Sequence, residues 1–121
     1  MNYEGGGLLL ECVDSLRAQG VLETIVVDNG SVDGSTAVAA SEFPDLRVVT
    51  PGRNLGFAGG ANLGAHQARG GLLLFLNPDV RLPAGSVRTM AGITTDTSTP
   101  VPRSSTRTAS DRPTTPCLVA Q

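Results

Sequence analysis

The chain has little positive charge, and what it has is dispersed. Its 121 residues carry a formal net charge of −2, and the nine cationic side chains, all arginines, are scattered along the sequence. A nucleic-acid backbone is bound through a concentrated positive field, which this sequence does not provide. We therefore expect no nucleic-acid partner.

Cysteine and long apolar runs are scarce as well. Cys12 lies in an apolar helical pattern and Cys117 in a polar tail, so they form neither a metal-binding pair nor a disulfide framework. The longest apolar run, residues 72–76, is far shorter than the ~20 residues of a membrane helix, and no charged-then-apolar signal sequence opens the chain. These absences predict a cytoplasmic protein without a transmembrane segment.

Helical and strand patterns alternate over the first ninety residues. The predicted helices cover residues 8–19, 36–43, 61–69 and 83–90, and the predicted strands cover residues 24–27, 46–50 and 72–76. The third strand is apolar on both faces, which is typical of a sheet covered by helices on two sides. The pattern predicts one α/β domain over residues 1–91, with a parallel sheet and helices on both faces.

The composition changes after Gly92. Residues 93–121 are dominated by Thr, Ser, Pro and Arg and carry almost no large apolar side chain, so they cannot bury enough surface to offset the entropy of ordering. We expect residues 92–121 to be a disordered tail. A modified linker or GC-rich DNA read in a shifted frame would each give this composition.

Carboxylates follow two of the predicted strands. Asp28 ends one strand and opens a polar loop with Asn29, and Asp79 follows another strand in Asn77-Pro78-Asp79. Ligands of open α/β sheets bind beyond the carboxyl ends of the strands, where these groups lie. The first loop is equally compatible with a helix-capping turn, and Asn77-Pro78-Asp79 with an ordinary turn. Alternatively, the proline of Asn77-Pro78-Asp79 holds the Asp79 carboxylate in place to bind a divalent cation that bridges a diphosphate.

A glycine-rich segment, residues 53–62, lies between these two loops. We expect residues 51–60 to form a connection, and glycines placed before a helix let backbone N–H groups approach phosphate oxygens. The segment is neither a P-loop nor a dinucleotide-binding fingerprint, and a flexible turning loop is the alternative. Gly5, Gly6 and Gly7 follow no strand in this chain and receive no phosphate-binding role.

The three segments occur in a distinctive order: V-V-D-N-G-S-x-D-G-S, then N-x-G-F-A-G-G-x-N, then L-N-P-D-V-x-L-P. In this order and spacing they resemble the family 2 glycosyltransferases of GT-A fold, particularly the rhamnosyltransferase-like branch. The resemblance covers residues 2–90. It implies a Rossmann-like nucleotide-sugar-binding domain with a dTDP- or UDP-sugar donor and a polysaccharide or lipid-linked acceptor. A longer form would be peripheral at the inner face of the membrane.

The resemblance also implies roles for individual residues. Asp28, with Asn29 in its loop, matches the carboxylate that binds the donor's pyrimidine base, and Tyr3 matches a residue that packs on that base. Asp79 matches the ligand of a divalent metal, Mg²⁺ or Mn²⁺, and Asn77 faces the ribose or the metal. The remaining matches belong to the glycine-rich donor loop: Asn54, Gly59, Gly60 and Asn62.

Two parts of the family pattern are missing. The first, central strand would end where Met1 stands, so we expect its neighbours to lack backbone partners and the polypeptide to be poorly stable. The carboxylate that activates the acceptor lies about a hundred residues beyond the metal motif, so no catalytic residue is assigned. Asp96 and Asp111 are too near to be carried over. The lone His66 is expected on a helix surface.

Three interpretations follow from this sequence. The chain is an incomplete and inactive fragment of a glycosyltransferase, a module that binds a nucleotide sugar without catalysis, or a non-functional product of a truncated or frameshifted gene. Turnover would distinguish the first two, and a soluble, cooperatively melting polypeptide would count against the third.

Overall fold

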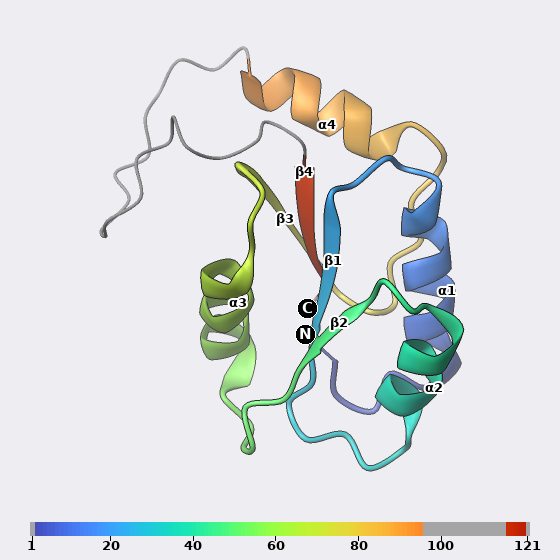
Figure 1. The fold of residues 1–121 in the computed structure, drawn as a ribbon, viewed down its shortest axis with the longest axis vertical. Coiled ribbons are helices and arrows are strands. Elements are labelled where there is room, and N and C mark those ends of the chain that lie inside the picture. Colours follow the sequence, from blue (N-terminus) through green and yellow to red (C-terminus); the bar gives the residue numbers. More distant parts are fainter. Residues whose placement is uncertain (1, 96–115, 121) are drawn as a thin grey trace.

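The fold is a parallel sheet with helices on both faces (Figure 1). The computed structural model describes residues 2–95 and 116–120. Its elements are, in chain order, α1 (Gly6–Arg17), β1 (Glu23–Val27), α2 (Ser35–Glu42), β2 (Arg47–Val49), α3 (Gly56–Gln67), β3 (Leu72–Leu76), α4 (Ser86–Thr95) and β4 (Pro116–Ala120). The α/β fold class and the helix–strand alternation expected from the sequence are confirmed.

The four strands are ordered β2-β1-β4-β3, and every pair is parallel. Val26 of β1 lies opposite Val48 of β2 on one side and opposite Ala120 of β4 on the other. All carboxyl ends therefore point to one edge of the sheet, which we call the carboxyl edge, and the strands begin at the opposite, amino edge. Strands β1 and β3, which precede Asp28 and Asp79, lie on either side of β4.

Strand β1 is more deeply buried than β2 and β3, because helices cover both of its faces. Val26 packs with Leu9, Val13 and other residues of α1 and α2, whereas Ile25 and Val27 point to the α3 face, where Ala68 lies. In Figure 1, α3 lies on one side of the sheet and α1 and α2 on the other. Full burial of such a side chain is worth about 1.5–3 kcal/mol.

The central position of the sheet is filled from the far end of the chain. Before α1, the described residues contribute to the sheet through Asn2, which bridges Asp28 in parallel. Strand β4 lies between β1 and β3, pairing Glu23 with Cys117 and Leu76 with Ala120. The expectation that β1 and β3 lack backbone partners is therefore wrong.

Three further expectations need correction. Helix α3 begins at Gly56, so the glycine-rich segment is a connection only before that residue. Strand β3 is partly exposed, with Phe75 42% accessible, because it is the last strand of the sheet. Residues 93–95 continue α4 and Pro116–Ala120 form β4, so these parts of the expected tail are ordered. The expected disorder of residues 96–115 lies outside the described residues.

Candidate functional site

Polar loops gather at the carboxyl edge. Asp28 follows β1, Asn77 follows β3, and Asn2 lies between their strands beyond the end of β4. Backbone hydrogen bonds join Asn2 to β1 on both sides of Asp28, from Asn2 N–H to the Val27 carbonyl at 2.7 Å and from Asn29 N–H to the Asn2 carbonyl at 2.9 Å. The topology therefore brings together the two loops that the sequence indicated.

Asp28 is only 6% exposed, and its carboxylate accepts hydrogen bonds from neutral groups. Its Oδ1 accepts from the Ser31 hydroxyl at 2.6 Å and from the Ser31 backbone N–H at 3.1 Å. Its Oδ2 accepts from the Thr36 hydroxyl at 2.9 Å. The turn interpretation is thus realised in the structure. These donors are hydroxyls and a backbone N–H, and none of them is a cation.

A second carboxylate, Asp33, closes the same loop. Its Oδ1 accepts from the hydroxyl of Ser35 at 2.7 Å and from its backbone N–H at 3.0 Å, and its Oδ2 accepts from the Gly6 N–H at 2.9 Å. The Ser35 hydrogen bonds, then the one from Gly6, lower the pKa of the Asp33 carboxyl. Asp33 therefore joins the start of α2 to the start of α1.

Asn29 connects the Asp28 loop to the glycine-rich segment. Its side chain is buried, and its Nδ2 donates to the Asn54 Oδ1 at 3.0 Å and to the Gly56 carbonyl at 3.4 Å. Its Oδ1 accepts from the Leu55 N–H at 3.3 Å. The structure thus brings Asn29 and Asn54 together, and both amides position the start of α3.

The glycines expected to approach phosphate lie inside α3. In an α-helix, the N–H groups of Gly59 and Gly60 bond to carbonyls four residues earlier, so they are not available to a ligand. The first N–H groups of α3 belong to Gly56 and the two residues after it, and the one on Gly56 already bonds to the Asn54 Oδ1 at 2.8 Å. Asn62 is exposed further along the helix, as is His66.

The remaining predicted site residues are exposed at the same edge. Tyr3 is 57% accessible, and Asn77 and Asp79 are exposed on the turn after β3, where the Val80 N–H donates to the Asn77 carbonyl at 3.2 Å. Burial raises the pKa of the Cys12 thiol beneath this turn, and the Asp79 charge also raises it. The Cys12 Sγ lies 3.7 Å from the Asn77 carbonyl oxygen.

The sequence predicted a divalent metal bound by Asp79, and the described residues around this side chain supply few further ligands. Within residues 2–95 and 116–120, no group of three His, Cys, Asp or Glu side chains could hold an ion. Mg²⁺ is often bound by one or two carboxylates together with substrate phosphates. The exposed Asp79 fits that arrangement only with a diphosphate supplying further oxygens. Asp96 and Asp111 lie outside the described residues.

The sequence did not single out the side chains that hold Asp28. Asn2, Ser31, Ser35 and Thr36 form hydrogen bonds at this edge. Ser31 and Ser35 belong to the first quoted motif, but the sequence assigned neither of them an individual role, because serine is common in any loop. Only Asn2 was noticeable, as a polar residue directly before Tyr3.

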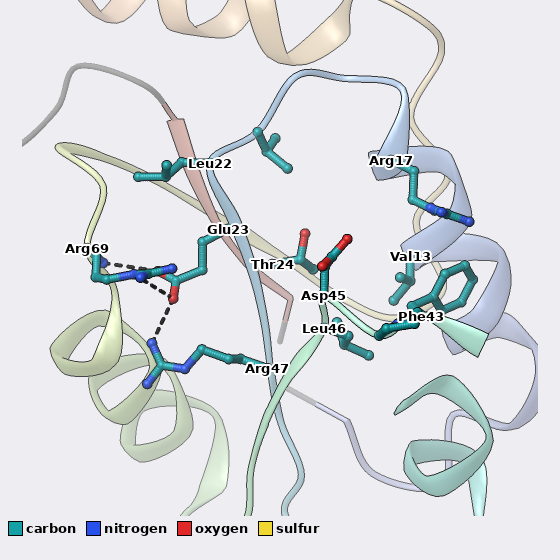
Figure 2. A pocket seen from close by; sticks show the side chains of 12 residues that line it. Val13, Arg17, Leu22, Glu23, Thr24, Phe43, Asp45, Leu46, Arg47 and Arg69 are labelled. Carbon is teal, nitrogen blue, oxygen red and sulfur yellow. Dashed lines mark hydrogen bonds and ion pairs between the residues drawn. The ribbon is translucent and has the colours of Figure 1, made fainter. Parts of the chain in front are cut away.

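A pocket of about 510 Å³ lies at the amino edge, and none of the predicted site residues lines it. Figure 2 shows Glu23 in this pocket between Arg47 and Arg69. The Glu23 Oε1 lies 2.7 Å from the Arg47 Nη1 and 3.2 Å from the Arg69 Nε, and its Oε2 accepts from the Arg69 backbone N–H at 3.1 Å. These charges neutralise one another and stabilise the starts of β1 and β2.

Two kinds of comparison relate the chain to known proteins. An uncharacterized protein of Mycobacterium tuberculosis (strain CDC 1551 / Oshkosh) is 35% identical over 92 residues, which is 74% of this chain and 29% of the relative. An N-acetylglucosaminyl-diphospho-decaprenol L-rhamnosyltransferase of the same species, from strains CDC 1551 / Oshkosh and ATCC 25618 / H37Rv, is 30% identical over 84 residues, which is 60% of this chain and 27% of the relative. The chain thus spans less than a third of the length of these relatives.

No solved structure matches the chain significantly. Across the parts of the chain that the structure describes, no helix is long and apolar enough to cross a membrane. The family described as glycosyl transferase family 2 matches residues 2–101, which is most of the chain. The chain therefore belongs to glycosyl transferase family 2.

Proposed function

We propose that residues 2–95, together with β4, bind the donor of a glycosyltransferase reaction, a dTDP- or UDP-sugar. The enzyme would transfer the sugar to a polysaccharide or lipid-linked acceptor. The family supports glycosyl transfer, and one relative is an N-acetylglucosaminyl-diphospho-decaprenol L-rhamnosyltransferase. The single observation that carries the proposal is the Asp28 carboxylate at the carboxyl edge, which accepts hydrogen bonds from neutral donors.

The hydrogen bonds of Asp28 determine which oxygen can serve a ligand. Each carboxylate oxygen accepts about two hydrogen bonds. Both positions on Oδ1 are occupied by Ser31, whereas among the described residues Oδ2 accepts from Thr36 alone. The remaining acceptor position therefore lies on Oδ2. A uracil or thymine base offers one N–H, at N3, which this position would accept.

The other residues of the edge would hold the rest of the donor. Tyr3 would pack on the base, and Asn77 would face the ribose. Asp79 would ligate Mg²⁺ or Mn²⁺, which when bound neutralises the charge of the departing nucleoside diphosphate. Asn29, Asn54, Gly59, Gly60 and Asn62 would form the donor-loop side of the site, the first two by fixing the start of α3.

Nucleotide titrations test this assignment. UDP and N3-methyl-UDP differ only at the base N–H, so their affinity ratio reports that hydrogen bond. We expect the wild-type protein to prefer UDP by about tenfold, the worth of one good hydrogen bond to a charged group. Asp28→Asn should remove most of this preference. Equal affinity of the wild-type protein for both nucleotides would exclude the proposed role of Asp28.

The metal role needs a separate measurement. Asp79→Ala should abolish the increase in UDP affinity caused by Mn²⁺ while leaving the preference for UDP over N3-methyl-UDP unchanged. Arg81→Ala, two residues away, is the matched control because its exposed side chain pairs with Glu11 at 3.4 Å rather than with the edge. An Mn²⁺ effect that survives Asp79→Ala would refute the assignment of this ligand.

Binding without transfer is the second candidate. It requires only the donor-side residues named above and no group that activates an acceptor. Incubation with dTDP-rhamnose or UDP-glucose and a lipid-diphosphate acceptor distinguishes the two, because only the enzyme releases nucleoside diphosphate. Binding that persists without release would identify the module.

A further inference from the structure

Asn2 is completely buried at the centre of the carboxyl edge. Its Nδ2 donates to the hydroxyl oxygens of Ser31 and Ser35, both at 3.0 Å, and its Oδ1 accepts from the Gly5 N–H at 3.2 Å. The Gly5 N–H can only donate, so the amide oxygen must face Gly5. The two amide hydrogens of Asn2 consequently point at the two serines.

The hydrogen bonds of the Ser31 hydroxyl leave it one possible orientation. Its oxygen accepts from the Asn2 Nδ2 and also from the Glu4 backbone N–H, at 3.0 Å each. A hydroxyl has one hydrogen and two acceptor positions, so both of its acceptor positions are filled. Its hydrogen must therefore go to the Asp28 Oδ1, 2.6 Å away.

Ser35 is arranged in the same way. Its oxygen accepts from the Asn2 Nδ2 at 3.0 Å, and its hydrogen goes to the Asp33 Oδ1 at 2.7 Å. One buried amide thus directs two hydroxyl hydrogens toward two carboxylates. Both carboxylates belong to the loop between β1 and α2.

We propose that Asn2 is a positioning residue for donor recognition. By directing the Ser31 hydrogen onto the Asp28 Oδ1, it fills that oxygen and leaves Oδ2 as the acceptor for the base. The effect on donor recognition rests on the proposed function. The arrangement of hydrogen bonds around Asn2 does not depend on any ligand. Asn2 acts through Ser31 and Asp28 and need not contact the donor.

Asn2→Asp replaces hydrogen-bond donors by acceptors in a side chain of nearly the same shape. The amide donors become carboxylate acceptors, so the single hydrogen of Ser31 is shared between two carboxylates, at positions 2 and 28. The Asp28 side chain can then turn away from Ser31, and Oδ1 and Oδ2 lose their distinct environments. Ala40→Asp, on an exposed part of α2, is the matched control because it adds the same charge away from these hydroxyls.

Amide hydrogen exchange tests this arrangement of hydrogen bonds in the absence of a ligand. The Ser31 N–H bonds to Asp28 and the Glu4 N–H bonds to the Ser31 hydroxyl. Both should exchange about tenfold faster in Asn2→Asp, the change expected from one lost hydrogen bond. Ala40→Asp should leave both rates within twofold. Unchanged exchange in Asn2→Asp would overturn the inference whether or not the protein binds nucleotide.

The affinity ratio of UDP to N3-methyl-UDP tests the proposed effect of Asn2 on recognition of the base. Asn2→Asp should reduce the wild-type ratio severalfold, toward one. A role in folding alone would lower the affinity for both nucleotides equally and leave the ratio unchanged. If Asn2→Asp does not fold, Ser31→Ala removes the same hydrogen bond to Asp28 and should lower the ratio alike. A wild-type ratio of one refutes the proposed function, whereas a ratio that persists in both variants refutes the inference.

Discussion

Strand β1 carries a buried carboxylate at each of its ends, and the two have opposite environments. Glu23 at the amino edge is bonded by Arg47 and Arg69, and its side chain is 2% exposed. Asp28 at the carboxyl edge is bonded by hydroxyls and a backbone N–H. Cations cancel the charge of Glu23, whereas neutral donors leave the charge of Asp28 in place. Only Asp28 therefore retains a net charge to offer a ligand.

The same difference explains why the pocket of about 510 Å³ does not mark the proposed site. Three of its charged groups, Glu23, Arg47 and Arg69, already form ion pairs with one another. Its apolar wall includes Val13, Phe43 and Leu46. At the carboxyl edge, the loops hold an oriented carboxylate. Because ligands of open α/β sheets bind beyond the carboxyl ends of the strands, we propose the site there rather than in the pocket.

Deleting residues 116–121 should have the largest effect, because β4 supports both edges. The deletion separates β1 from β3 and leaves backbone groups of both strands without partners. We expect a loss of about 5 kcal/mol or more, enough to abolish cooperative unfolding. Thermal unfolding by circular dichroism measures this, with deletion of Gln121 alone as the control. A truncated chain that still melts cooperatively near the wild-type temperature would show that β4 is dispensable.

Disruption of the Glu23 cluster should have the next largest effect. Arg47→Met removes one of the two arginines that pair with the buried carboxylate, and we expect a loss of about 2–3 kcal/mol, below the value for a fully buried pair. Glu23→Gln should cost only about 1 kcal/mol, because the arginine side chains, 40% and 67% exposed, remain hydrated. Urea unfolding gives both values.

The two edges should respond independently in these variants. UDP affinity should stay within twofold in Arg47→Met at a temperature where the variant is folded, because the cluster lies at the amino edge. A large loss of affinity would mean that the amino edge takes part in binding, and the comparison of the two carboxylates would fail.

The sequence predicted most of the sheet, because strong local patterns encode it. The apolar β-branched run before Asp28 and the leucine run of β3 each gave a strand at the observed place. The start of α3 was missed because Gly56, Gly59 and Gly60 have low helix propensity. Tertiary contacts overcome that propensity: Asn29 and Asn54 hold the first turn, and Gly60 is buried.

Strand β4 could not be predicted from local patterns. Only Cys117–Ala120 are apolar in a segment of polar composition, and the strand exists because β1 and β3 leave a position open between them. The carboxyl edge shows the same limit. The motif indicated Asp28, which accepts from Ser31 and Thr36. Asn2, which donates to Ser31, comes from a separate segment that only the fold brings next to this loop.

A smaller effect is expected where α1 begins, next to Asn2. A Cβ at Gly5 would lie 2.3 Å from the Asn2 Oδ1, so Gly5→Ala must displace the amide and should cost about 1–2 kcal/mol. Gly7→Ala meets no atom within 4 Å and should be neutral or slightly stabilising. Urea unfolding of both variants measures the difference. Equal stabilities would show that the Asn2 amide is free to move.

The smallest effect concerns Asp33 and distinguishes it from the ion-paired Glu23. The Ser35 hydrogen bonds hold the pKa of Asp33 below its ordinary value, so its contribution to stability is present above pH 3.8 and is lost as the pH falls through the lowered value. Ser35→Ala should raise this pKa toward the ordinary value, as measured by carboxyl ¹³C NMR titration. Ser41→Ala removes a hydroxyl that bonds only to the Val38 carbonyl and should not change it. Because the donors are neutral, the Asp33 titration should also depend little on salt; a pronounced salt dependence would mean that cations stabilise the carboxyl edge too.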